Sequence, residues 1–321
     1  MRRLLLLAFA VLLSAPVQAE PRKLKVGMAI PSYAHAVLWI AKDGGFFKSE
    51  GLDVDVFVVK GSAEAAKLLL AGSLDVALAG GDAVVKADLA GADLASFAVF
   101  VGTFYHRVVA GEGVPDVAAL KGKSLGLPFL GGPQDMTARA ALKRAGLKPG
   151  EDVKLVNMGA EYARLAAVTQ GRVDAVTSDA APTVLAGLKL RVAADVPAWK
   201  IPFPYMSAVA RRSFLEKDQD AALRFLRALY KAAVFYRDHE KESLELLAKE
   251  PLGEAGTAEQ AAESYRFNGP SRFTYPPTTG EDGFKTVLEL LEPAPKEPPK
   301  PETFVDGRLL EKLRKQGLFG R

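Results

Sequence analysis

Aromatic, hydroxyl and acidic side chains recur in this sequence directly after short apolar runs, where strands of a parallel sheet would end. Ligands of open α/β sheets bind beyond these carboxyl ends, where the starts of helices also offer free N–H groups. This rule selects the following candidate ligand-binding residues: Ser32, Tyr33, His35, Gly81, Asp82, Gly132, Gln134, Asp135, Thr137, Glu161, Tyr162, Ser178 and Asp179.

The side chains in this set fit two kinds of ligand. Helix starts with Ser32, Thr137 and Ser178 would suit a sulfonate or another anion. Tyrosines together with carboxylates would instead suit a planar nitrogen heterocycle, which stacks on rings and donates hydrogen bonds. Because the carboxylates would repel an anion, the chemistry favours a neutral or cationic organic ligand. A structural alternative exists for Asp82 and Asp135, since acidic residues at helix starts are typical caps.

Catalytic and metal-binding patterns are absent from the sequence. There is no cysteine, which excludes disulfides, thiolate metal sites and thiol nucleophiles. The only histidines are His35, His106 and His239, without the spacing of a metal site, and no Gly-x-Ser-x-Gly motif precedes His35 or His106, the two that a Ser-His-Asp triad would need. We therefore predict a binding protein that is not an enzyme and has no cofactor and no metal.

Composition and the N-terminus define the class of protein. Hydrophobic residues make up 49% of the 321 residues and charged residues 25%, which excludes a largely disordered chain. The net charge of +4 is small, and no basic stripe indicates a nucleic-acid partner. Residues 1–19 combine Arg2 and Arg3 with an apolar run from Leu4 to Leu13, which predicts a signal peptide cleaved after Ala19. We expect a mature protein in the periplasm with no membrane span.

Hydrophobic periodicity predicts alternating strands and helices and therefore an α/β fold with a largely parallel sheet. Two sets of strands are expected, one at residues 24–30, 52–60, 74–80 and 95–101 and the other at 124–128, 153–157, 173–179 and 190–195. The segments Leu69–Gly80 and Val168–Asp179 share a glycine and an aspartate at an equal offset of 99 residues. This repeat indicates two related lobes. Residues 218–250 are expected to form a long helix, and Pro293–Pro301 a stiff connector.

Several blocks resemble a known family in a fixed order. AKDGGFFKSEGLDVDV (Ala41–Val56), GSAEAAKLLLAGSLDVALAG, KGKSLGLP, GRVDAV and VARRSFLEK are similar to the periplasmic solute-binding proteins of ABC importers. The branch is the one that takes nitrate, taurine, alkanesulfonates and thiamine-pyrimidine precursors. The resemblance runs from about Leu24 to Leu313 and does not specify the ligand, although a histidine at position 35 also resembles the pyrimidine-precursor members.

The resemblance implies the two-lobed type II periplasmic binding protein fold, with the ligand in a cleft between lobes joined by two crossovers. Lobe one would comprise residues 20–103 plus 208–321, including the C-terminal helices, and lobe two residues 108–202. The crossovers would lie near residues 104–107 and 203–207, which adds Tyr105 and Tyr205 to the candidate site. Hinge closure would capture a small molecule, and a monomer would deliver it to an ABC permease in the inner membrane.

Alternatives of other classes share this layout. An exported sensing module of a signalling receptor would have the same fold and cleft. Hydroxymethylbilane synthase and the pyrimidine-precursor synthases are similar two-lobed enzymes, but both depend on cysteines that this chain lacks.

Overall fold

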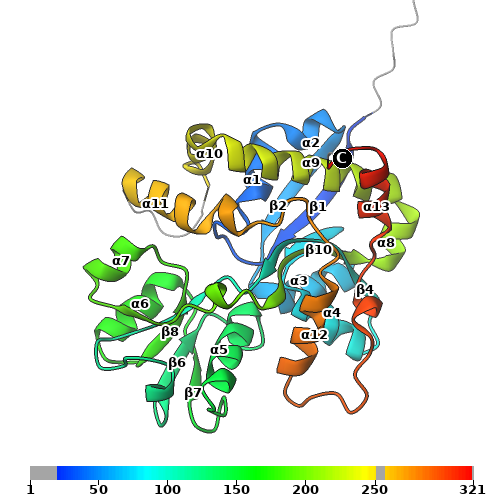
Figure 1. Cartoon of the computed structure of the whole chain (residues 1–321). Coiled ribbons are helices and arrows are strands. Elements are labelled where there is room, and N and C mark those ends of the chain that lie inside the picture. The colour runs from blue at the N-terminus through cyan, green and yellow to red at the C-terminus, as the bar shows by residue number, and fades with distance from the viewer. Residues whose placement is uncertain (1–19, 251–256, 320–321) are drawn as a thin grey trace, which may run out of the picture.

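The computed structural model describes residues 20–250 and 257–319, so the predicted signal peptide lies outside the described residues. Two five-stranded sheets form the centres of two lobes (Figure 1). We call the lobe around the sheet that contains the first strand the first lobe, and the other the second lobe. This arrangement confirms the predicted α/β fold class.

The first sheet has the strand order β2-β1-β3-β10-β4. Strand β1 pairs in parallel with β2 and β3, whereas β10 runs antiparallel to both β3 and β4. The strand bounds are β1 Arg22–Met28, β2 Leu52–Val58, β3 Val76–Ala79, β4 Leu94–Thr103 and β10 Pro202–Arg211.

The second sheet repeats this plan with the order β7-β6-β8-β5-β9. Strand β6 pairs in parallel with β7 and β8, and β5 runs antiparallel to β8 and β9. The strand bounds are β5 Arg107–Ala110, β6 Ser124–Leu127, β7 Lys154–Asn157, β8 Ala175–Ser178 and β9 Arg191–Ala194. Both sheets are therefore mixed. The expectation of a largely parallel sheet missed β5 and β10; the expected crossovers included Arg107 of β5 and residues 203–207 of β10.

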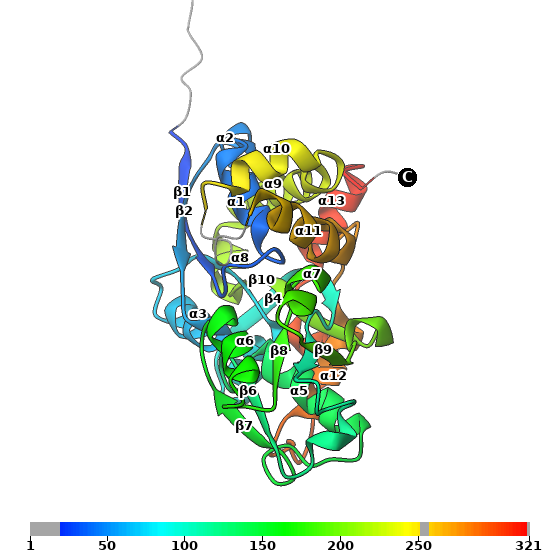
Figure 2. The ribbon, with the colours of Figure 1, turned by 90° about the vertical axis from the view of Figure 1, so that its left-hand side faces the viewer.

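Helices cover the faces of both sheets (Figures 1 and 2). In the first lobe they are α1 Ala36–Asp43, α2 Phe46–Ser49, α3 Gly61–Leu70 and α4 Gly81–Leu89. In the second lobe they are α5 Pro133–Arg144, α6 Glu161–Thr169 and α7 Pro182–Gly187. The C-terminal part adds α8 Arg212–Lys217, α9 Gln219–Asp238, α10 Glu240–Leu247, α11 Ala258–Asn268, α12 Glu281–Leu290 and α13 Arg308–Lys315.

The predicted long helix at residues 218–250 is two helices, which is a correction to the sequence analysis. Helix α9 ends at Asp238, and His239 adopts φ −131° and ψ 69°, outside the helical region, before α10 begins. The ring of His239 stacks on Phe235 at 4.4 Å. The apolar periodicity continues through this break, so hydrophobic spacing alone could not reveal it.

The internal repeat is visible in backbone detail. Gly72 and Gly171 follow α3 and α6 with φ of +73° and +66°, a left-handed conformation that favours glycine. Asp75 accepts a hydrogen bond from the Lys25 N–H at 2.9 Å, and Asp174 accepts one from the Ser124 N–H at 2.9 Å. Each aspartate thus ties the start of one strand to its parallel neighbour.

The chain passes between the lobes twice. The first passage, residues 104–106, joins β4 to β5, and the second, residues 195–201, joins β9 to β10. Residues 203–207 lie within β10, so this part of the expected second crossover is a strand of the first sheet. No helix among the described residues is long and apolar enough to cross a membrane.

Candidate functional site

Polar and aromatic side chains from both lobes and from the first passage converge between the two sheets. We call six of these residues the central cluster: His35, Tyr105, His106, Asp179, Tyr205 and Asn268. All except Asp179 are buried, and the Asp179 side chain is 17% exposed. Such a dense polar group between two apolar sheets is costly unless its members have partners, which makes their hydrogen bonds informative.

Two pairs of stacked rings form the floor of the central cluster. The rings of Tyr105 and Tyr205 stack with centroids 4.9 Å apart, and those of Phe104 and Phe203 stack at 4.4 Å. Each pair joins the first passage between the lobes to strand β10. Aromatic contact therefore holds the first passage against β10, and the two tyrosines belong to the central cluster.

The two buried histidines are neutral. Burial lowers the pKa of His35 to about 4. Burial and the nearby guanidinium groups of Arg164 and Arg107 hold the pKa of His106 well below its usual range. The Ser32 hydroxyl lies 3.1 Å from His35 Nδ1, but His35 Nε2 and His106 Nδ1 have no hydrogen-bond partner among the described residues. Two neutral ring nitrogens thus remain for another molecule.

Asp179 carries the exceptional carboxylate of the site. Burial, with Glu161 nearby, raises the pKa of Asp179 to about 7. Its nearest ionisable partner is His106, with Nε2 at 3.8 Å from Oδ1, and this histidine is neutral. Desolvation with no cation in contact explains why this carboxyl group holds its proton to a higher pH than an exposed aspartate does.

Glu161, by contrast, is fully engaged. One carboxylate oxygen accepts a bond from the Ser178 hydroxyl and the other from Arg164. Arg164 is itself buried and also donates to the carbonyl groups of Gly159 and Thr177. The guanidinium group of Arg164 is therefore already paired with groups of the second lobe, which leaves it poorly placed to attract an anion.

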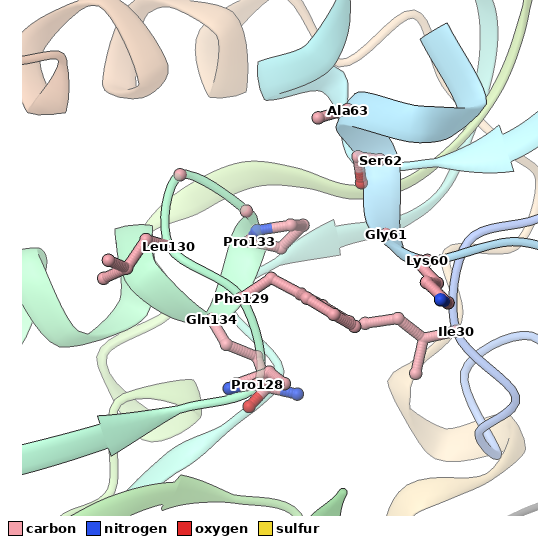
Figure 3. A pocket seen from close by; sticks show the side chains of 12 residues that line it. Ile30, Lys60, Gly61, Ser62, Ala63, Pro128, Phe129, Leu130, Pro133 and Gln134 are labelled. Atoms are coloured by element: carbon pink, nitrogen blue, oxygen red, sulfur yellow. The ribbon is translucent and has the colours of Figure 1, made fainter. Parts of the chain in front are cut away.

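A small cavity lies beside the central cluster, between the lobes (Figure 3). We call it the interlobe cavity. Its volume of about 30 Å³ holds roughly two water molecules. Figure 3 shows Phe129 reaching from the second lobe toward Ile30 of the first. The lining residues are Ile30, Lys60, Gly61, Ser62, Ala63, Pro128, Phe129, Leu130, Gly131, Gly132, Pro133 and Gln134.

Two helices, α3 and α5, begin at this cavity from opposite lobes. Ser62 lies in the first turn of α3, and its hydroxyl accepts the Gly80 N–H at 3.0 Å. Gln134 connects the cavity to the charged network, since its side-chain oxygen accepts the Thr177 hydroxyl at 2.7 Å. The positive ends of the two helix dipoles favour a negatively charged group in this cavity.

A lysine joins the lobes next to the cavity. Lys86 lies 3.2 Å from Asp82 Oδ2 and donates to the carbonyl of Gly131 in the second lobe. Asp82 is buried, its pKa is raised by that burial although Lys86 acts in the opposite direction, and its Oδ1 has no partner among the described residues. Helix α4 begins at Gly81 without a side-chain cap, so the capping interpretation of Asp82 was wrong.

The remaining candidates from the sequence lie at varied distances from these groups. Gly81 packs within the first lobe, where an added Cβ would lie 2.5 Å from Pro204. Asp135 accepts the Gly131 N–H and pairs with Arg139, and the Thr137 hydroxyl donates to Pro133. Tyr162 is 38% exposed. The other candidates belong to the cluster, the cavity or their direct neighbours: Ser32, Tyr33, His35, Tyr105, Gly132, Gln134, Glu161, Ser178, Asp179 and Tyr205.

Sequence reasoning missed His106 and Asn268 as site residues. His106 follows Tyr105 in the short segment that joins the apolar strands β4 and β5. A polar residue in such a connection could have been selected from the sequence as a candidate for the interface. Asn268 ends helix α11, far from any strand end, and its side chain donates to the Asp179 carbonyl. The rule based on strand ends could not select it.

Together, the two α/β lobes, the double passage and the polar interface define a type II periplasmic binding protein fold. Residues 32–243 match the family described as NMT1/THI5 like. The chain belongs to this family. The protein named "Putative binding protein YtlA" from Bacillus subtilis (strain 168) is 30% identical over 229 residues, 69% of this chain and 68% of that protein.

Solved structures match nearly the whole chain. The periplasmic aliphatic sulphonate binding protein SsuA from Escherichia coli superposes with a TM-score of 0.71 at 21% identity, covering 90% of this chain and 99% of that chain. The periplasmic nitrate-binding protein NrtA from Synechocystis PCC 6803 gives 0.74 at 17%, covering 92% and 89%. At such identities the likeness shows the fold.

The same fold also occurs in DszB, whose cysteine-to-serine mutant was solved with biphenyl-2-sulfinic acid (TM-score 0.66, 14% identity, 92% of this chain and 99% of that chain). The other relatives described above are named as binding proteins. Among residues 20–250 and 257–319, no cluster of three or more His, Asp or Glu could hold a metal ion.

Proposed function

We propose that this chain is the solute-binding component of an ABC import system. It would act in the periplasm after removal of residues 1–19 and deliver a small molecule to a permease in the inner membrane. The supporting observation is the central cluster, a buried polar interface between two lobes in which ring nitrogens of His35 and His106 and the amide oxygen of Asn268 have no partner among the described residues. Buried polar groups of this kind are costly unless a ligand satisfies them.

Binding would couple to movement of the two lobes. The passages at residues 104–106 and 195–201 would serve as the hinge, about which the first lobe would move against the second. The two stacked ring pairs that join the first passage to β10 would stay together while the rest of the interface between the lobes separates. A ligand that contacts both lobes shifts the equilibrium toward closure by its differential affinity for the closed form.

The ligand we favour is a planar nitrogen heterocycle, such as a pyrimidine or thiamine-like compound. Tyr105 and Tyr205 place stacked aromatic rings in the central cluster, and the Asp179 carboxyl group lacks a cationic partner within contact. Neutral histidine nitrogens can accept or donate a hydrogen bond. A ring with N–H donors and acceptors would satisfy all of these groups, whereas the adjacent carboxylates disfavour a bare anion.

An anion such as an alkanesulfonate, taurine or nitrate is the second candidate. The observation that favours it is the interlobe cavity, where Lys60 and the N-terminal ends of α3 and α5 converge. Helix starts bind anions through free N–H groups. SsuA and NrtA, which share the fold, are named for sulphonate and nitrate binding.

Thermal melting of ligand-stripped protein distinguishes the two candidates. The panel comprises pyrimidine, thiamine, taurine, an alkanesulfonate and nitrate. A compound at 100 times its Kd adds about 2.7 kcal/mol of stability. We expect a shift with the heterocycles that Asp179→Asn abolishes and Lys60→Gln retains. A shift with anions only, abolished by Lys60→Gln, would overturn the preferred ligand. Recovery of a chemically altered compound would overturn the binding role itself.

A further inference from the structure

Helix α11, residues 258–268, belongs to the first lobe by its anchors. The Tyr265 hydroxyl donates to the backbone carbonyl of Tyr236 in α9, and Arg266 pairs with Glu240 of α10 at 2.8 Å. The Tyr33 hydroxyl also donates to the Ala261 carbonyl at 3.2 Å. These contacts fix the helix to the face of the first lobe that looks toward the second.

The same helix bonds directly to the second lobe. Glu263 accepts hydrogen bonds from the Thr183 N–H, at 3.2 Å, and from the Thr183 hydroxyl. Figures 1 and 2 both show α11 beside α7, where Thr183 lies. Phe267 lies under the guanidinium group of Arg107 at 4.4 Å. Separation of the lobes would break each of these contacts while leaving the anchors to α9 and α10 intact.

Asn268 joins this contact to the central cluster. Its amide nitrogen donates to the Asp179 carbonyl, and its own backbone carbonyl accepts the Tyr105 hydroxyl at 2.6 Å. The residue is 2% exposed, and its Oδ1 has no partner among the described residues. One side chain therefore holds the second lobe and offers a buried acceptor at the candidate ligand site.

We propose that α11 is a clasp that stabilises the closed state, and that Asn268 couples the clasp to the ligand through its free acceptor. The clasp follows from bonds that cross the interface, whereas the role of Asn268 toward a ligand rests on the proposed function. A ligand donor that satisfies Oδ1 would strengthen the Asn268–Asp179 contact, because a fixed amide loses less rotamer freedom on bonding again. Ligand binding and closure would then share this residue.

The clasp is tested on ligand-stripped protein by pulsed electron paramagnetic resonance. The chain has no cysteine, so Lys67→Cys on α3 and Gln170→Cys after α6 accept spin labels without background. Both positions are exposed and lie on opposite lobes. The distance distribution is measured in the wild-type background and with Glu263→Ala, Asn268→Ala and Arg266→Gln. The last variant breaks a pair of the same helix that stays within the first lobe.

We expect a closed population in the wild-type background and in Arg266→Gln. In Glu263→Ala and Asn268→Ala the ratio of closed to open should fall by about three- to tenfold, the usual effect of losing one or two hydrogen bonds. Unchanged ratios in both variants, or an equal fall in Arg266→Gln, would overturn the clasp. A single open distance in the unmutated background would also overturn it.

The ligand contact of Asn268 needs a second measurement. With the panel compound that gives the largest melting shift, Asn268→Ala should weaken affinity at least about tenfold more than Glu263→Ala does. Equal losses would remove Asn268 from ligand recognition and leave the clasp. If no pyrimidine, thiamine, taurine, alkanesulfonate or nitrate binds, the proposed ligands fail, as does this role of Asn268, while the label distances still decide the clasp.

Discussion

The two lobes share one framework but differ where it meets the candidate site. Equivalent aspartates, Asp75 and Asp174, directly precede strands β3 and β8 and hydrogen bond to a neighbouring strand. Three residues later the lobes diverge. The first lobe continues with Leu78, Ala79 and Gly80, and the second places Thr177, Ser178 and Asp179 at the equivalent positions.

This difference separates the requirements of folding from those of binding. The start of each strand is constrained by its neighbours, so the same residue type serves both lobes. The end of β3 is apolar and leads directly into α4, whereas the end of β8 carries two hydroxyl groups that donate to Gln134 and Glu161. Most of the polar chemistry at strand ends thus comes from the second lobe.

Replacing the paired residues Leu78 and Thr177 should give the largest contrast. Leu78 is fully buried, so Leu78→Ala should lower the free energy of unfolding by about 2–5 kcal/mol. Thr177→Val keeps the shape but removes the hydroxyl bond to Gln134, and should cost only about 1–2 kcal/mol. Urea unfolding of both variants measures these values. Equal costs would mean that the two strand ends do not differ in role.

The framework aspartates should behave alike. Asp75→Ala and Asp174→Ala each leave a strand N–H without its acceptor, and each should cost about 1 kcal/mol. Ligand affinity should change less than about twofold. The exposed Asp55 on β2 is the control, because Asp55→Ala should stay within about 0.5 kcal/mol. Denaturant titrations check the set, and a cost in one lobe only would contradict the shared framework.

The pH dependence of stability should have opposite signs at the two sides of the interface. The Asp179 pKa of about 7 lies above its unfolded value near 3.9, so its contribution to stability is lost as pH rises from about 4 to about 7. The His35 pKa of about 4 lies below its unfolded value near 6.5, so its contribution is lost as pH falls through that range.

Melting temperatures from pH 4 to pH 8 test this contrast. Relative to wild type, Asp179→Asn should gain stability as pH rises from about 4 to 7, because the variant has no proton to lose. His35→Gln should gain relative stability as pH falls from about 6.5 to 4. Curves that run parallel to wild type in both variants would show that neither group titrates as its burial requires.

The smallest effect is expected at the rim of the second lobe. Tyr162 is 38% exposed and lies outside the central cluster. Tyr162→Ala should therefore change stability by less than about 0.5 kcal/mol and ligand affinity by less than about threefold, as measured by calorimetry. A loss of ligand affinity greater than tenfold would show that the binding surface extends to Tyr162 at the rim.

Much of the fold could be predicted from the sequence, because its cause is local. Alternating apolar runs revealed eight of the strands, and the offset of Gly72 and Asp75 from Gly171 and Asp174 revealed the repeat. Strands β5 and β10 escaped, since each pairs antiparallel with strands distant in sequence. The break at His239 escaped because the apolar spacing continues through it.

The site was less accessible to sequence reasoning. The rule based on strand ends selected residues at the interface between the lobes. Ten of the candidate residues lie in or next to the central cluster or the interlobe cavity. Asn268 reaches the interface only through the packing of α11 on α9 and α10, which depends on tertiary contacts that no local pattern contains. Contact between any of these residues and a ligand remains a prediction.

The position of β10 has a consequence for how the protein is made. All five strands of the second sheet lie within residues 107–194, so that sheet can assemble as one continuous piece of chain. The first sheet needs β10 between β3 and β4, and β10 is synthesised about a hundred residues after both. The lobe that begins at the N-terminus is therefore the last to be completed, and a chain that stalls before residue 202 would carry a finished second lobe beside an open gap in the first.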